Sequence, residues 1–268
     1  MGLAKQLVTN ALSKRLLLPN SKRVIFVYHD ISEPHEAHYS EDYSTPPENF
    51  VEHISYLSEH FDWVDLNEIL AFEPKNKRRL ASITFDDGFL SVKNFALPYL
   101  SSMQIPFALF VNKTAIESNR LQNLEDPDDW SGDESQKVYL DRDDVKVLAE
   151  AGVLIGSHST GHRILRDCDL TTLTDEILVN KKFVEDIVNY DVEHFAIPYG
   201  KKEHYDKNMI DYCLSVGHRY IYSTNPVYFS KANLLGGSHL IPRIGIPNLS
   251  IGHLRFLLNR PLLKRIDI

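Results

Sequence analysis

The chain has 268 residues, of which 43% are hydrophobic, and its formal net charge is −8 at pH 7. This apolar content supports a packed core and excludes an intrinsically disordered chain, while the acidic balance disfavours nucleic acid as a partner. The two cysteines, Cys168 and Cys213, are too few for a disulfide framework or a cysteine-rich zinc site, so we expect both to be packing thiols.

Strands and helices are expected to alternate along most of the chain. Short runs rich in β-branched and aromatic residues predict strands at 23–28, 80–85, 107–111, 153–156, 195–197, 219–222 and 240–246. Amphipathic or capped stretches predict helices at 47–61, 90–103, 141–152, 170–190 and 203–216, with His53 and His60 expected on the surface of the first. The alternation predicts βαβ units with a mostly parallel sheet, in one domain over residues 1–268.

Two groups of polar residues directly follow predicted strands. The sequence TFDDG at 84–88 ends a strand with the adjacent carboxylates Asp86 and Asp87, and SHSTGH at 157–162 follows another strand with His158 and His162. Two neighbouring carboxylates repel each other unless a cation or a proton separates their roles. One aspartate with two histidines supplies three ligands and leaves a coordination position open, which indicates a catalytic divalent metal site. The second aspartate would then be free to act as a base.

These motifs, together with FAIPYG at 195–200, resemble the polysaccharide deacetylase family, carbohydrate esterase family four. The resemblance covers most of the chain and implies an α/β fold, a distorted (β/α) barrel of about seven parallel strands. It also implies that Asp86 is the general base and that Asp87, His158 and His162 bind the metal. Mixed imidazole and carboxylate ligands suit one divalent ion, with zinc expected and nickel or cobalt as alternatives.

Two further residues are candidates on the same face. Proline at 198 has no N–H to donate, so the backbone N–H of Tyr199 is a candidate hydrogen-bond donor to the oxyanion of the reaction. Most family members carry an arginine that orients the base, and here that position holds Ala196. We expect Arg243, on the last predicted strand, to replace it.

The general acid is expected to be His29. The usual acid motif of the family is not evident near the C-terminus, and the sequence is similar to the poly-N-acetylglucosamine deacetylase branch, whose acid is an early histidine. His29 follows a strand, so it should open onto the same barrel face as Asp86, whereas His239 precedes a strand and His253 belongs to an outer helix.

The function expected from these features is metal-dependent removal of an N-acetyl group from an amino sugar, in a glycan or in a lipid- or nucleotide-linked glycan precursor. This is a hydrolase reaction on a non-peptide C–N bond. One alternative is a glycan-binding protein with a degenerate site, supported only by the missing arginine. Another is a related hydrolase of a non-sugar amide.

Two further segments, residues 1–20 and residues 121–138, bear on the location of the protein and on a predicted insertion. Residues 1–20 predict a basic amphipathic helix, in which 2–18 either contact a membrane surface peripherally or, as we slightly favour, pack on the barrel. A continuous apolar stretch is lacking in residues 1–19, so we expect a cytoplasmic protein, with peripheral contact at the inner membrane surface as a variant of this location. Residues 121–138 predict an acidic, solvated insertion loop, where Trp130 could stack on a sugar.

Overall fold

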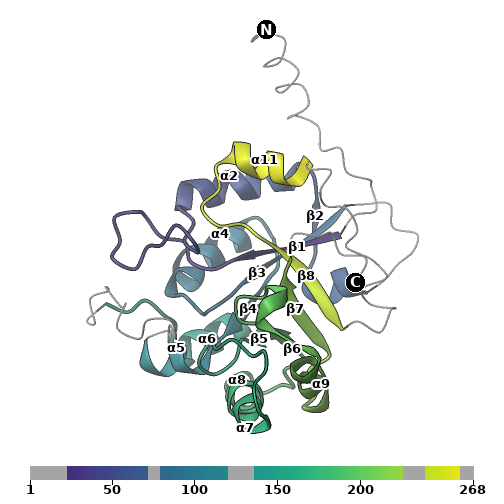
Figure 1. Cartoon of the computed structure of the whole chain (residues 1–268). Helices are drawn as coiled ribbons and strands as arrows, with labels where there is room; N and C mark the ends of the chain where they lie inside the picture. Colours follow the sequence, from purple (N-terminus) through teal and green to yellow (C-terminus); the bar gives the residue numbers. More distant parts are fainter. Residues whose placement is uncertain (1–22, 72–78, 120–135, 226–238, 260–268) are drawn as a thin grey trace, which may run out of the picture.

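The computed structural model describes residues 23–71, 79–119, 136–225 and 239–259 (Figure 1). The predicted helix at 1–20 and most of the acidic loop at 121–138, including Trp130, lie outside these residues. Within them, no helix combines the length and the apolar character that crossing a membrane requires.

Seven parallel strands form a closed barrel, which confirms the predicted fold class. Strand β1 pairs with β3 on one side and with β8 on the other, and the remaining neighbours pair in chain order. The barrel strands are β1 (Arg23–Tyr28), β3 (Leu80–Phe85), β4 (Phe107–Val111), β5 (Leu154–Ser157), β6 (His194–Ala196), β7 (Tyr220–Thr224) and β8 (Leu240–Gly245).

An eighth, two-residue strand lies outside the barrel. Strand β2 (Asp62–Trp63) pairs with Leu80 and Ala81 of β3, while β4 pairs with the later residues of the same strand. The helix that follows, α3 (Leu66–Leu70), belongs to a cluster of buried apolar residues with Leu80, Ile25 and Ile241 of the barrel strands. This segment therefore covers the N-terminal end of the barrel and does not cover the C-terminal ends of the strands.

Helices surround the barrel and bury its outer surface (Figure 1). Two of them contain a π-helical turn: η1 precedes α4, and η2 lies between α7 and α8 in one continuous helix over 170–188. The helical elements are α2 (Pro47–Ser58), η1 (Val92–Ala96), α4 (Leu97–Ser102), α5 (Lys113–Ser118), α6 (Arg142–Glu150), α7 (Leu170–Leu173), η2 (Thr174–Leu178), α8 (Val179–Val188), η3 (Lys202–His204), α9 (Lys207–Ser215) and α11 (Ile251–Asn259).

The register of the strands decides which side chains reach the barrel mouth. Tyr28 of β1 is level with Phe85 of β3, so the next residues, His29 and Asp86, are level as well. Successive residues of a strand face opposite sides, and Ile25, Ala108 and Tyr222 belong to the interior cluster. Every second residue from Ile25 faces the interior, so His29 lies on the interior side of β1. Thr84 accepts a hydrogen bond from Arg243, so Asp86, two residues later, lies on the interior side of β3.

One surface expectation is wrong. His53 on α2 is fully buried, with its Nε2 2.6 Å from the carbonyl oxygen of Leu249 and its Nδ1 3.4 Å from the hydroxyl of Tyr28. Both ring nitrogens therefore have polar partners, which is how a buried histidine is accommodated. His60 is half-buried rather than fully exposed.

Candidate active site

The turn after β3 holds the two adjacent carboxylates in a strained conformation. The N–H of Gly88 donates to the carbonyl of Asp86 at 3.0 Å, and Asp87 between them has a φ of 70°. This is a γ-turn with a positive central φ, which is rare for a residue other than glycine and costs about 1–3 kcal/mol. Asp86 and Asp87 are both almost completely buried at the end of β3.

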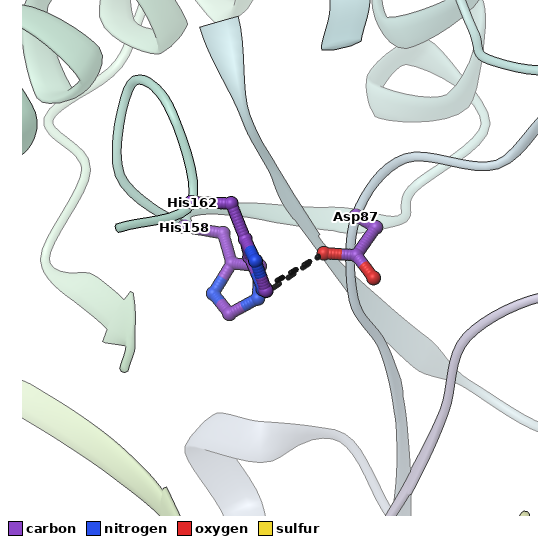
Figure 2. A group of neighbouring side chains, drawn as sticks. All are labelled: Asp87, His158 and His162. Carbon is purple, nitrogen blue, oxygen red and sulfur yellow. Dashed lines mark ion pairs between the residues drawn. The ribbon is translucent and has the colours of Figure 1, made fainter. Parts of the chain in front are cut away.

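The two histidines come from the loop that follows β5, and both face Asp87 (Figure 2). The Nε2 atoms of His158 and His162 each lie 3.4 Å from Oδ1 of Asp87, and the two ring centroids are 5.0 Å apart. One potential ligand atom from each of these three residues lies within 4.8 Å of the other two. The structure thus brings together the three metal ligands expected from the sequence.

The orientation of His158 is fixed from behind. Its Nδ1 lies 2.8 Å from the carbonyl oxygen of Ala196 in β6, so Nδ1 carries a proton and Nε2 faces Asp87. A hydrogen bond from the far ring nitrogen to a carbonyl is the usual support of a metal-binding histidine. The backbone of Ala196 therefore has a place in the site although its side chain has no polar group.

The protonation states fit a divalent cation. Burial lowers the pKa of His162 to about 4, so its imidazole is neutral near pH 7. Burial alone would raise the pKa of Asp87, but the imidazoles of His162 and His158 keep it below the ordinary value. Oδ1 of Asp87 is buried and has no hydrogen-bond partner among the described residues. A buried carboxylate oxygen that lacks a hydrogen-bond partner and faces two imidazole nitrogens is a donor set that could hold a metal ion.

Asp86 is held by a different partner. Arg243 of β8 donates from its two terminal nitrogens to the two oxygens of Asp86, at 2.7 and 2.6 Å. The guanidinium is 0% exposed and lies 5.3 Å from the ring centroid of Phe110 and 5.8 Å from that of Tyr222. Burial would raise the pKa of Asp86, but Arg243 and His158 lower it below the ordinary value. The expected contact between Arg243 and Asp86 is thus present.

His29 lies beside the same carboxylates. It is half-buried at the end of β1, close enough to Asp86, Asp87 and His162 to interact electrostatically with all three. The N–H of Asp86 donates to the carbonyl of Tyr28, the residue before His29, at 3.0 Å. His239 and His253 are at other places: His239 directly precedes β8, and His253 lies on the exposed side of α11. The structure therefore keeps His29 as the candidate nearest to the carboxylate pair.

Tyr199 lies at the rim, in a second strained turn. The N–H of Gly200 donates to the carbonyl of Pro198 at 2.7 Å, and Tyr199 has a φ of 60°, so this is another γ-turn. The ring of Tyr199 is 39% exposed, and its centroid is 4.5 Å from that of His162. Of the eight non-glycine residues with positive φ in the described ranges, four belong to this site: Asp87, Ser159, His162 and Tyr199. Strain of this kind concentrates at functional sites.

Two residues that were not expected from the sequence support the histidine loop. Asn112, the first residue after β4, is fully buried and its amide donates to the carbonyls of His158 and Ser159. The hydroxyl of Ser159 accepts from the N–H of His162 at 3.0 Å. Position gave a usable signal for Asn112, because it directly follows a barrel strand as Asp86 and His158 do. For Ser159 the spacing of three residues before His162 is the only signal.

The fold and the site define an enzyme class: a parallel barrel with an Asp–His–His centre and a separate buried carboxylate at the C-terminal end of its strands. The family model of polysaccharide deacetylases matches residues 73–221, which is more than half of the chain. The chain belongs to the polysaccharide deacetylase family, and it is accordingly a carbohydrate N-deacetylase.

Solved structures show the same fold at low sequence identity. The deacetylase PplD of Streptococcus pyogenes superposes with a TM-score of 0.69 at 19% identity, covering 90% of this chain and 100% of that one. IcaB from Ammonifex degensii gives 0.68 at 19% identity, covering 89% and 97%. The deacetylase domain of BpsB from Bordetella bronchiseptica gives 0.63 at 13%, covering 85% and 98%. No curated protein sequence matches the chain.

Proposed function

We propose that the chain removes an acetyl group from an N-acetylated amino sugar of a glycan, using one divalent ion held by Asp87, His158 and His162. We further propose zinc as that ion, with nickel and cobalt as alternatives. The observation that carries the proposal is the buried Oδ1 of Asp87, which has two imidazole nitrogens at 3.4 Å and no hydrogen-bond partner among the described residues. A bound divalent ion would acidify water and polarise the acetyl carbonyl.

The protein's own residues would then divide the proton transfers. Asp86 takes the proton from the attacking water, because Arg243 and the surrounding charges keep the carboxylate ionised at neutral pH. The backbone N–H of Tyr199 is proposed to donate to the oxyanion that forms from the carbonyl. His29 gives a proton to the nitrogen of the leaving sugar amine. Acetate and a free amino sugar are the products.

Loss of the metal is the expected result of replacing both histidines. Dialysed protein with His158→Ala and His162→Ala together should contain less than about a tenth of the zinc of the original protein, because a structural or catalytic site of this kind needs at least three ligands. Elemental analysis of metal per protein chain measures this. His253→Ala, on the exposed side of α11, is the control and should keep full occupancy. Full occupancy in the double variant would show that the site is misassigned.

Replacing His29 by alanine should lower turnover about 10²- to 10⁴-fold, the usual contribution of a general acid, and should leave the metal content unchanged. The basic limb of the pH–rate profile should disappear with it, since that limb reports loss of the acid's proton. Release of free amine from an N-acetylglucosamine oligomer gives the rates. If His29→Ala and His239→Ala lowered turnover equally, His29 would have no specific role as the acid.

The sequence left two alternative functions open. A glycan-binding protein with a degenerate site is favoured only by the absence of an arginine at position 196. Arg243 supplies a guanidinium to Asp86 from another strand, which removes that support. A non-sugar amide as substrate is tested by comparing deacetylation of chitooligosaccharides with hydrolysis of cyclic ureides. A lipid- or nucleotide-linked precursor and a cytoplasmic, membrane-peripheral location stay predictions, which fractionation of the native host would test.

A further inference from the structure

The loop that carries both histidines cannot hold its shape by local preference alone. Ser159 and His162 both have left-handed backbone conformations, with φ of 67° and 56°. Each such conformation costs a non-glycine residue about 1–3 kcal/mol and persists only where surrounding contacts fix it. The second ligand, His162, is itself one of the strained residues. Contacts from outside the loop must therefore keep it in place.

Glu176 provides two of these contacts to consecutive residues. The N–H of Thr160 donates to its backbone carbonyl at 2.9 Å, and the N–H of Gly161 donates to its carboxylate Oε2, also at 2.9 Å. The hydroxyl of Thr160 donates to the carbonyl of Asp175 at 2.5 Å. Glu176 thus fixes the backbone directly before His162.

The position of Glu176 is unusual in two ways. It lies in the π-helical turn η2, where one residue more per turn interrupts the regular helical hydrogen bonds and frees carbonyls for other donors. It is also only 6% exposed, and no basic side chain in the described part of the chain forms an ion pair with it. Burying a carboxylate without a cation is unfavourable, so its hydrogen bond to Gly161 carries more weight than one at the surface.

We propose that Glu176 is a positioning residue for the metal centre. Its carboxylate holds the N–H of Gly161, and through Gly161 it keeps His162 in the conformation that faces Asp87. Glu176 does not reach the reacting atoms. Its effect is on the affinity of the site for the ion, and the inference rests on the proposed metal centre at Asp87, His158 and His162.

Four variants separate the hydrogen bond from the charge. Glu176→Gln keeps an oxygen at the same reach without the charge, whereas Glu176→Asp keeps the charge but shortens the side chain by one methylene. Glu176→Ala removes both. Glu185→Ala is the control on the same continuous helix: the Glu185 carboxylate pairs with Lys181 and also accepts from a backbone N–H, that of Val192 at 3.0 Å, away from the histidine loop.

The dissociation constant for zinc, measured by competition with a chelating dye, is the main readout. We expect Glu176→Ala and Glu176→Asp to bind zinc about 10- to 100-fold more weakly, which is the usual effect of removing a supporting partner of a metal ligand. Glu176→Gln should stay within about threefold of the original protein, and Glu185→Ala should not differ from it. Hydrogen exchange in the metal-free protein should be faster at residues 160–162 in the Ala and Asp variants only.

The outcomes distinguish this inference from the proposed function. If the original protein binds no zinc, or if zinc binding survives loss of both histidines, the metal centre itself is wrong and the role of Glu176 falls with it. If the original protein binds zinc and Glu176→Ala binds it equally tightly, only the role of Glu176 is overturned. The role of Glu176 would also be overturned if Glu176→Asp bound zinc as tightly as the original protein while Glu176→Gln bound it more weakly. Should Glu176→Ala not fold, the comparison of Gln with Asp decides.

Discussion

Replacing Asp86 by asparagine is expected to lower turnover about 10⁴-fold at neutral pH while the bound metal is retained, at the upper end of what a general base contributes. The asparagine amide is nearly the same size as the carboxylate but cannot accept the proton of the attacking water. Asp87, His158 and His162 are unchanged, so the metal-to-protein ratio should stay that of the original enzyme. Free amine released from an N-acetylglucosamine oligomer, together with elemental analysis, gives both quantities.

Asp87→Asn is the natural comparison, because it replaces the neighbouring carboxylate with the same chemistry. That variant should lose metal as well as turnover, since an amide oxygen is a weaker ligand than a carboxylate. The two variants therefore separate a base from a ligand at adjacent positions. Near-normal turnover of metal-loaded Asp86→Asn at neutral pH would rule out Asp86 as the base.

Arg243→Leu is expected to have the largest effect on stability. The guanidinium is fully buried and binds both oxygens of Asp86, so its loss leaves a buried carboxylate without its main partner. Breaking a buried ion pair from one side typically lowers the free energy of unfolding by about 3–5 kcal/mol. Turnover should fall as well, because the base loses its orientation. Urea unfolding and steady-state rates measure the two effects.

A double variant tests whether the two residues act as a pair. Asp86→Asn with Arg243→Leu removes both charges, so it should be more stable than the sum of the two single losses allows, while its turnover remains as low as that of Asp86→Asn. If the loss of unfolding free energy in the double variant equals the sum of the losses in the two single variants, Asp86 and Arg243 do not act as a pair.

The pair also predicts a pH dependence of stability. The folded pKa of Asp86 is below its ordinary value of about 3.9, so the pair stabilises the fold fully above that pH and loses its contribution as the pH falls through the folded pKa. The stability deficit of Arg243→Leu should accordingly be largest near pH 7 and shrink in acid. A deficit that grows on acidification would contradict the sign of this shift.

The barrel and most of the site could be predicted because the sequence pattern indicates where each strand ends. Parallel barrel strands are buried on both faces and read as short apolar runs, and the polar residues that follow them collect at one end. That reasoning placed Asp86, His158 and His29 at one mouth, and the structure has them there. The pairing of Arg243 with Asp86 could be expected because both positions are near the end of a strand.

Features that depend on contacts between distant segments could not be predicted. His53 is buried on α2 beside Phe50, Ile54 and Leu57, whereas its polar side chain led to the expectation of a surface position. The partners that allow its burial, Tyr28 and Leu249, are 25 and 196 residues away. The π-helical turn that carries Glu176 likewise has no signature in the local sequence, and its contact with Gly161 joins residues 15 positions apart.

The last barrel strand has a consequence for the order in which activity arises. Strand β8 closes the barrel against β1 through only two pairs of residues, Phe26 with Ile244 and Val27 with Gly245, and the same strand carries Arg243 to Asp86. During synthesis, a chain folded as far as β7 would hold the aspartate pair without the guanidinium that orients the base. Completion of the barrel and orientation of the base are therefore one event, so a chain in which β8 has not yet closed against β1 should have correspondingly low turnover.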